Sequence, residues 1–329
     1  MSLITKSINK RELICYFSLV IFNLFLLSLL LRVGIYFDLF PQSSSRLDVD
    51  RVIISNKVKL SKTKNNADIL LIGDSSCLMN IDAKKFTDLS AKKTYNLGTL
   101  SYLDFESYGA LLTNALNNNN SVSLVCLFIH PEFLRRVAPS DTHVQFFRSC
   151  NNDTYDNNTN KNNYIHSLLK LNIFENVFYS KTPIPLKNNF SQFYGFTTFL
   201  DQYLNDHNGS AIDPRVFDIE MEHGNVLYKI TDRKINDLIK LTALVPKESK
   251  FVLCLTPVPS EITGMNYSET IKSIRKQIFE HVKIDYILPM PFTLPATEFA
   301  TKTHLNATSR ALYTDIVYKK MIELDIIEK

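Results

Sequence analysis

A serine at the end of a predicted buried strand is the first residue that could carry chemistry. The apolar run 69–72 is followed by Gly73, Asp74 and Ser75, and the chain then takes the pattern of a helix. Ligand sites of doubly wound sheets lie at the carboxyl ends of the strands, which places Ser75 at such a site. The first N–H groups of the helix could stabilise an oxyanion that forms beside this serine. The alternative is that Asp74 and the serines only cap the helix.

A serine nucleophile needs a base, and His304 has the sequence context that favours this role. It lies in a predicted loop between the last strand and the final helix, again at the carboxyl edge of the sheet. Gly98, one of only eight glycines, closes another predicted strand, and its backbone N–H could approach a ligand closely. The sequence therefore predicts that segments from opposite ends of the chain meet at one edge.

Strand-like and helical segments alternate along the region that must position these residues. The strand-like runs are 68–72, 94–97, 122–129, 250–256 and 284–290. The segments with helical spacing are 81–89, 103–117, 227–245, 268–282 and 307–327. Such alternation indicates an α/β fold, in which a mostly parallel five-stranded sheet is covered by helices on both faces.

The first 36 residues predict a membrane anchor. Residues 13–31 form a run of 19 residues without a charge, long enough at 1.5 Å per residue to cross a hydrocarbon core of about 30 Å. Lys6, Lys10 and Arg11 precede the run, so the positive-inside rule places the N-terminus in the cytosol and the remainder outside. A cleaved signal peptide is the competing interpretation, but the run is long and no small-residue cleavage site follows it.

Two further segments depart from the alternation. Residues 37–66 are polar and mixed, which predicts a stalk with one strand at 51–58. Residues 140–225 contain an Asn-rich stretch and then an aromatic-rich one. A structureless loop of this length is improbable in a compact domain, so we expect an insertion with short helices. It could form a lid or substrate wall, or be a packing appendage. The main domain is predicted at 67–329.

Composition narrows the classes of partner. The 37 basic and 33 acidic residues give a net charge of +4, and no basic block is dense enough to predict nucleic-acid binding. The five cysteines show neither a disulfide framework nor the spacing of metal ligands. The sequence therefore implies no metal and no nucleic-acid partner.

Three blocks of this sequence resemble those of the SGNH, or GDSL-type, hydrolase superfamily. "IGDSS" resembles the first block with Ser75 as nucleophile, "NLGTLS" the second with Gly98 as oxyanion donor, and "THLNATSRALYTDI" the last with His304 as base. The order and spacing of the blocks also agree, over roughly residues 67–325. The resemblance implies a flavodoxin-like, three-layer α/β/α fold. "LTPVPSE" is similar to membrane-anchored envelope members, the relatives of alginate O-acetylation and teichoic acid D-alanylation proteins.

Two departures from the family pattern leave its site open. The family's acid lies three residues before the histidine, where this chain has Thr301, which cannot hold an imidazolium by charge. Glu298 could substitute as the acid partner; otherwise a Ser–His dyad, or no catalysis, remains. In the third block the family has an asparagine where this chain has His130. His130 could donate to an oxyanion, or its neighbours could satisfy it.

The resemblance implies a single-pass, extracytoplasmic enzyme that transfers or removes an ester-linked acyl group, such as acetyl, on an envelope polysaccharide. Ser75 and His304 would be catalytic, and Ser75, Gly98 and His130 would hold the oxyanion. No cofactor is implied, and a transferase would receive its acyl group from a membrane partner. The alternative is a non-catalytic scaffold or glycan-binding protein of an envelope polysaccharide assembly system, which Thr301 and the altered third block favour.

Overall fold

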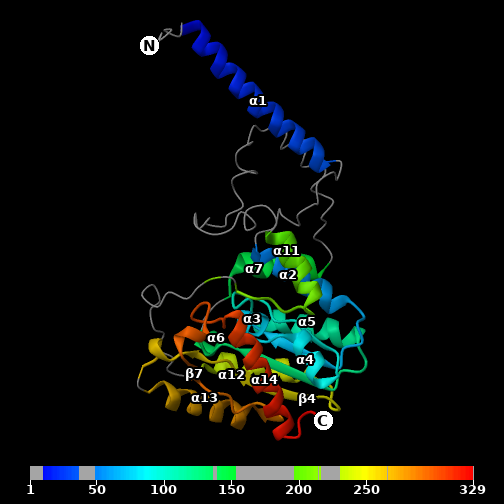
Figure 1. Cartoon of the computed structure of the whole chain (residues 1–329). Coiled ribbons are helices and arrows are strands. Elements are labelled where there is room, and N and C mark those ends of the chain that lie inside the picture. Colours follow the sequence, from blue (N-terminus) through cyan, green and yellow to red (C-terminus); the bar gives the residue numbers. More distant parts are fainter. Residues whose placement is uncertain are drawn as a thin grey trace. The chain divides into compact units, whose positions relative to one another are not determined.

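The computed structural model describes residues 10–36, 49–135, 139–152, 196–213, 215, 230–264 and 266–328. Contacts divide the chain into two units. One comprises Met1–Asp48 and Asn158–Thr198, and the other comprises Val49–Asn157 and Phe199–Lys329. The first unit contains helix α1 (Lys10–Tyr36), and the second contains the sheet (Figure 1).

A five-stranded parallel sheet forms the centre of the second unit. Its strands are β1 (Ile69–Gly73), β2 (Thr94–Asn96), β3 (Leu124–Ile129), β4 (Lys250–Leu255) and β6 (Tyr286–Ile287). Their order is β2-β1-β3-β4-β6, which confirms the predicted mostly parallel five-stranded sheet. Gly73 is in register with Phe128, so the residues that follow β1 and β3 meet at one edge.

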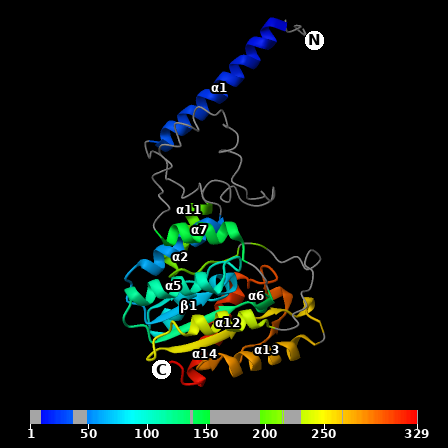
Figure 2. The same cartoon turned by 180° about the vertical axis from the view of Figure 1, so that it is seen from behind.

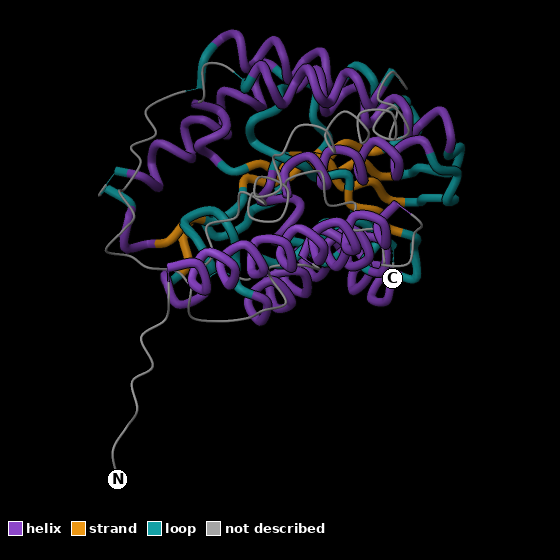
Figure 3. The backbone as a smooth tube through the Cα atoms, turned by 90° about the horizontal axis from the view of Figure 1, so that it is seen from above, coloured by secondary structure: helices purple, strands orange, loops and turns teal. Residues whose placement is uncertain are grey.

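Helices cover both faces of this sheet, as the alternation predicts. On one face lie α3 (Ser75–Asn80), α4 (Ala83–Ser90) and α14 (Ala307–Glu323), and Figure 1 shows α4 and α14 in front of the strands. On the other lie α5 (Phe105–Asn118) and α12 (Asp232–Thr242), seen in Figure 2, and α12 contacts α13 (Tyr267–His281). Figure 3 shows the strands between the two layers of helices. Two short parallel strands, β5 (Val258–Pro259) and β7 (Thr293–Leu294), form a separate pair.

Residues 49–62 form helix α2 (Val49–Lys62), so the predicted strand at 51–58 is wrong. The β-branched run Val52, Ile53 and Ile54 is typical of a strand. In the helix these three side chains and Val58 are all buried, and α2 packs against α5 and α7 (Asp141–Asn151). Tertiary packing therefore outweighs local propensity, and this part of the predicted stalk belongs to the second unit.

The predicted membrane span at 13–31 lies within α1. In the part of the chain that the structure describes, no helix combines the length and apolar character needed to cross a bilayer. The predicted transmembrane helix is therefore unconfirmed. In the predicted insertion at 140–225, the described helices are α7 and α11 (Phe196–Asp206). Residues 153–195, 214 and 216–229 lie outside the described residues.

A buried cluster on the α14 face holds the helix that carries Ser75. Ile69 and Leu71 of β1 belong to the same cluster as Cys77 of α3 and Tyr313 and Val317 of α14, and each is at most 2% exposed. Burial of one large apolar side chain stabilises a fold by about 1.5–3 kcal/mol. This packing fixes the position of α3 against the sheet.

Candidate active site

The chain reaches Ser75 through a turn that only glycine can make. Gly73 has φ of +145°, and a Cβ atom there would lie 1.8 Å from the carbonyl oxygen of Phe128 on β3. A side chain at this position is therefore excluded by both conformation and space. The chain consequently leaves β1 and enters α3 at Ser75, beside the end of β3.

Asp74 caps α3, as one alternative predicted. Its Oδ1 accepts from the backbone N–H of Ser76 at 2.9 Å and from the Ser76 hydroxyl at 2.6 Å. Its Oδ2 accepts from the backbone N–H of His130 at 3.0 Å, which ties α3 to the end of β3. Capping is thus the role of Asp74, whereas the hydroxyl of Ser75 has a different partner.

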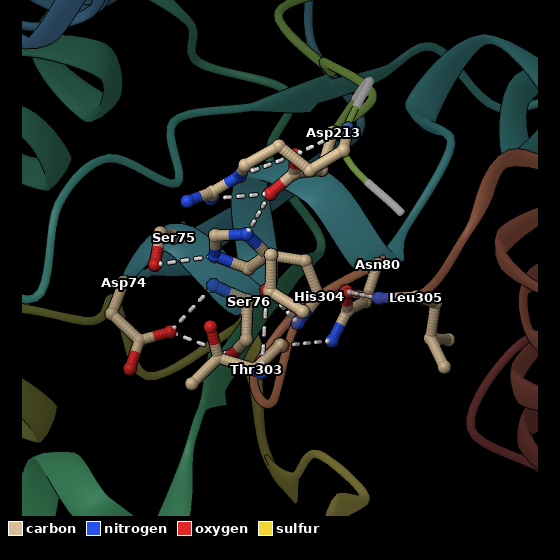
Figure 4. Close-up of polar contacts among 10 residues, drawn as sticks. Asp74, Ser75, Ser76, Asn80, Asp213, Thr303, His304 and Leu305 are labelled. Atoms are coloured by element: carbon tan, nitrogen blue, oxygen red, sulfur yellow. Dashed lines mark hydrogen bonds and ion pairs between the residues drawn. The ribbon is translucent and has the colours of Figure 1, made fainter. Parts of the chain in front are cut away.

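That partner is His304, and the two residues predicted to be catalytic lie together. Nε2 of His304 lies 2.9 Å from Oγ of Ser75, and Nδ1 lies 2.6 Å from Oδ2 of Asp213 (Figure 4). The side chains of His304 and Asp213 are 8% and 1% exposed, so water is largely excluded from their contact. Serine, histidine and carboxylate in this arrangement form the geometry of a nucleophile, a base and a group that orients the base.

Asp213, and not the predicted Glu298, is the carboxylate that contacts His304 in the structure. Glu298 ends the short helix Ala296–Glu298 and accepts a hydrogen bond from the Ser309 hydroxyl in the first turn of α14. Thr301, at the family's acid position, accepts from the backbone N–H of His304 at 3.2 Å through its hydroxyl. Thr301 therefore shapes the histidine turn and supplies no charge.

Sequence reasoning missed Asp213 because it lies in the predicted insertion, 91 positions from His304. No short spacing connects the two residues, and Asp213 closes no predicted strand. The only local sign is the sequence Asp213–Pro214–Arg215, which is ordinary in a loop. Contacts that form only in the folded chain bring this carboxylate to the site.

Arg215, together with His304, keeps Asp213 ionised. Its backbone N–H and Nε donate to Oδ1 at 3.0 and 2.9 Å, and its Nη2 donates to Oδ2 at 2.6 Å. Burial by itself would raise the pKa of Asp213, but the hydrogen bonds from Arg215 and His304 outweigh it and hold the pKa well below its ordinary value. Asp213 is therefore ionised throughout the physiological pH range.

The segment before Asp213 is hydrogen-bonded to α3, α4 and β2. The backbone N–H of Ala211 donates to the carbonyl of Leu78 at 3.0 Å. The Ser210 hydroxyl accepts from the backbone N–H of Ala83 at 2.9 Å and from Nδ2 of Asn96 at 3.1 Å. These contacts hold the chain just ahead of the carboxylate against the elements that flank the nucleophile.

Lys57 of α2 supports the same segment from within the core. It is fully buried, and its Nζ donates to the carbonyl oxygens of Asn96, at 2.9 Å, and of Gly209. Burial lowers its pKa to about 7. A helix that the sequence assigned to a stalk thus helps to place Asp213.

Asn80 fixes the loop that carries His304. Its Oδ1 accepts from the backbone N–H of Leu305 at 2.8 Å, and its Nδ2 donates to the carbonyl of Thr303 at 3.2 Å (Figure 4). Asn80 is fully buried at the end of α3. One six-residue helix therefore carries Ser75 at its start and, at its end, the side chain that fixes the His304 loop.

The structure gives Gly98 a packing role in place of the predicted oxyanion role. Its backbone N–H donates to Oδ1 of Asn96 at 2.7 Å and is therefore already used. A Cβ atom at Gly98 would lie 2.6 Å from the backbone nitrogen of Leu78 and 2.7 Å from Cβ of Cys77. The glycine is needed because α3 approaches the backbone closely here.

His130 presents an unused donor at the end of β3. Its Nδ1 accepts from the backbone N–H of Glu132 at 3.2 Å, which places the proton of the neutral ring on Nε2. Nε2 is buried and has no hydrogen-bond partner among the described residues. Burial is the largest influence on the pKa of His130 and lowers it, although Asp74 opposes the shift. The ring is therefore neutral at physiological pH, and its neighbours satisfy only one of its nitrogens.

Comparisons with known proteins give limited help in assigning this site. No family model matches the sequence, and no curated protein matches it. A solved structure described as a platelet activating factor from Streptococcus pneumoniae is similar over 84% of this chain and 92% of that one, at 10% identity and a TM-score of 0.36. A likeness at this level carries no argument about fold or activity. The SGNH resemblance therefore remains a prediction from the three sequence blocks.

Proposed function

We propose that this protein is a serine esterase or O-acyltransferase. The observation that carries the proposal is the unbroken contact chain from Oγ of Ser75 through the ring of His304 to Asp213. Because Asp213 is ionised and can only accept hydrogen bonds, the proton of the neutral His304 ring lies on Nδ1. This N–H donates a hydrogen bond to the carboxylate. Nε2 is then left without a proton, as an acceptor for the Ser75 hydroxyl requires.

The reaction divides into two acyl transfers. Oγ of Ser75 attacks the carbonyl carbon of the ester while its proton passes to Nε2 of His304. The tetrahedral intermediate collapses when His304 gives this proton to the departing alcohol oxygen, which leaves an acyl group on Ser75. Water, or a sugar hydroxyl, then loses a proton to His304 and attacks the acyl carbon. Collapse of the second intermediate returns the proton to Ser75 and releases the acid or the new ester. Asp213 stabilises the imidazolium present in both intermediates.

Two donors are proposed for the negative oxygen of these intermediates. One is the backbone N–H of Ser75, at the first position of α3, where a helix has no internal partner for it. The other is the Nε2–H of His130, which is buried and unpartnered among the described residues. An oxyanion would give this buried donor the partner that it lacks, which is favourable because unpaired buried donors are costly.

We propose an acylated polysaccharide of the cell envelope as substrate, with acetyl as the acyl group. The similarity of "LTPVPSE" to the envelope branch of the SGNH superfamily supports it. The uncharged run at 13–31 supports an extracytoplasmic location behind a single-pass anchor. If the protein is a transferase, its acyl donor would be a membrane partner, because the proposed reaction contains no diffusible cofactor.

The non-catalytic alternative rested on the altered third block and on Thr301, which left the triad without an acid. Asp213 supplies a carboxylate to the same nitrogen of His304 that an acid at 301 would reach, so this objection no longer applies. A scaffold would also have no need for a buried carboxylate and a buried imidazole aligned on a serine hydroxyl. We therefore favour the enzyme.

A fluorophosphonate probe tests the proposal directly, since it reacts only with an activated serine. We expect the full chain to be labelled, Ser75→Ala and His304→Ala to remain unlabelled, and Ser76→Ala to be labelled as the matched control. Ser76 is the adjacent serine, and its hydroxyl contacts Asp74 and not His304. Folded wild-type protein that takes no label between pH 6 and 9 would overturn the proposal.

A further inference from the structure

Arg215 is unusual because an exposed cation reaches a buried carboxylate. The side chain of Arg215 is 65% exposed, whereas that of Asp213 is 1% exposed. Arg215 makes two hydrogen bonds to Oδ1 and one to Oδ2, and Oδ2 also contacts Nδ1 of His304. The carboxylate that holds the base is thus shared with a second cationic group.

We infer that Arg215 is a positioning residue that sets the pH range in which His304 can act as a base, by sharing the carboxylate of Asp213. The effect of Arg215 on catalysis rests on the proposed function. Its effect on proton binding by His304 does not depend on that function.

Two effects of Arg215 act on His304 in the same direction. A carboxylate that already accepts three hydrogen bonds from arginine has less negative charge to offer an imidazolium. The guanidinium also adds a positive charge near His304, which disfavours a second positive charge on the ring. Both effects weaken proton binding at Nε2. Nε2 of His304 is therefore more readily left free to accept the proton of Ser75 than it would be beside Asp213 alone.

Other polar groups also lie around His304. Ser75 of α3 contacts Nε2 and is uncharged, and Asp74 is turned toward Ser76 and His130. His130, at the end of β3, interacts electrostatically with His304 and is neutral at physiological pH. Lys302, on the same loop as His304, also acts electrostatically on His130. Replacing Arg215 removes the cation that shares the carboxylate of Asp213 and leaves these residues in the sequence unchanged.

The experiment measures the titration of His304 in the full chain by NMR of labelled histidine, with the signal assigned by its loss in His304→Gln. We expect the midpoint of this titration to move to higher pH in Arg215→Ala, because His304 should then hold its proton more tightly. Arg215→Lys should give an intermediate value, because it keeps the charge but loses the planar fork. Arg233→Ala is the matched control, since the side chain of Arg233 is 66% exposed, but it lies on α12 beside Asp237. This control should leave the titration unchanged.

A second measurement separates this inference from the proposed function. The acid limb of fluorophosphonate labelling should move to higher pH in Arg215→Ala by the same amount as the NMR titration. Wild-type protein that is never labelled would overturn the enzyme, while a shifted titration would still uphold the role of Arg215. Identical titrations of His304 in wild type, Arg215→Ala and Arg215→Lys, with unchanged circular dichroism, would overturn the inference. If Arg215→Ala fails to fold, the comparison of wild type with Arg215→Lys decides the matter.

Discussion

Replacing Asp213 by asparagine separates a working triad from a Ser–His pair. The amide keeps the shape of the carboxylate but carries no charge, and its NH₂ group can donate to Nδ1 of His304. Nδ1 then becomes an acceptor, and the ring proton moves to Nε2, where the ring can no longer take the proton of Ser75. We expect Asp213→Asn to fold and to lose most of its activity.

The size of the loss follows from the contact between Asp213 and His304. Their charged atoms lie 2.6 Å apart, and at an effective dielectric constant of about 20 two such charges attract by about 6 kcal/mol. Arg215 shares the carboxylate, so we expect Asp213 to stabilise the imidazolium form of His304 by less than this, roughly 4 to 5 kcal/mol. A barrier higher by that amount lowers kcat by about 10³- to 10⁴-fold.

Hydrolysis of p-nitrophenyl acetate, with the rate of fluorophosphonate labelling beside it, measures this loss. Glu298→Gln is the matched control, because it makes the same chemical change on a carboxylate that contacts Ser309 and not His304. We expect it to retain activity within about threefold of wild type, as substitutions outside the site usually have small effects. If Asp213→Asn kept nearly full activity while Glu298→Gln lost it, the assignment of the acid would be refuted.

Two further predictions concern His130 and Lys57. His130→Ala should lower kcat on p-nitrophenyl acetate by about 10²- to 10³-fold with little change in KM, and His130→Gln should recover part of it through its amide donor; a change in KM alone would contradict the oxyanion role. The pKa of Lys57 is lowered to about 7 in the folded chain, so between pH 7 and its unfolded value of 10.5 only the unfolded chain holds this proton. The free energy of unfolding should therefore rise with pH by up to about 1.4 kcal/mol per unit. Urea unfolding between pH 7.5 and 9 should show this slope in wild type and a smaller one in Lys57→Met; equal slopes would mean that the buried amine does not titrate there.

The sheet and the position of Ser75 could be predicted because their signals are local. Buried parallel strands are continuous apolar runs, so all five strands were found within a few residues of their ends. Gly73 and Ser75 follow one of these runs directly, and His304 lies in the loop before the final helix. Parallel strands place all their carboxyl ends at one edge, so the meeting of Ser75 and His304 follows from topology.

Helix α2 and Gly98 were misread because their roles depend on distant contacts. The run Val52–Ile54 has the composition of a strand, and only its packing against α5 and α7 makes it a helix. Glycine is scarce in this sequence, and the structure does require a glycine at position 98. The close approach of α3 requires a glycine there, and no local pattern distinguishes this requirement from that of a ligand.

Asp213 shows why the third member of such a site is the hardest to predict. The chemistry requires only that a carboxylate reach Nδ1 of His304, and it imposes no position in the sequence. The spacing of the SGNH pattern would place that acid three residues before the histidine. An acid on the same loop would lie close to the imidazole without contacts from other segments. Here Thr301 keeps the turn, while the carboxylate arrives on a separate segment that Ser210 and Lys57 hold in place. The geometry of the base therefore depends on contacts from α2, α4 and β2 as well as on the catalytic residues themselves. Substitutions at these supports should lower activity through the position of Asp213.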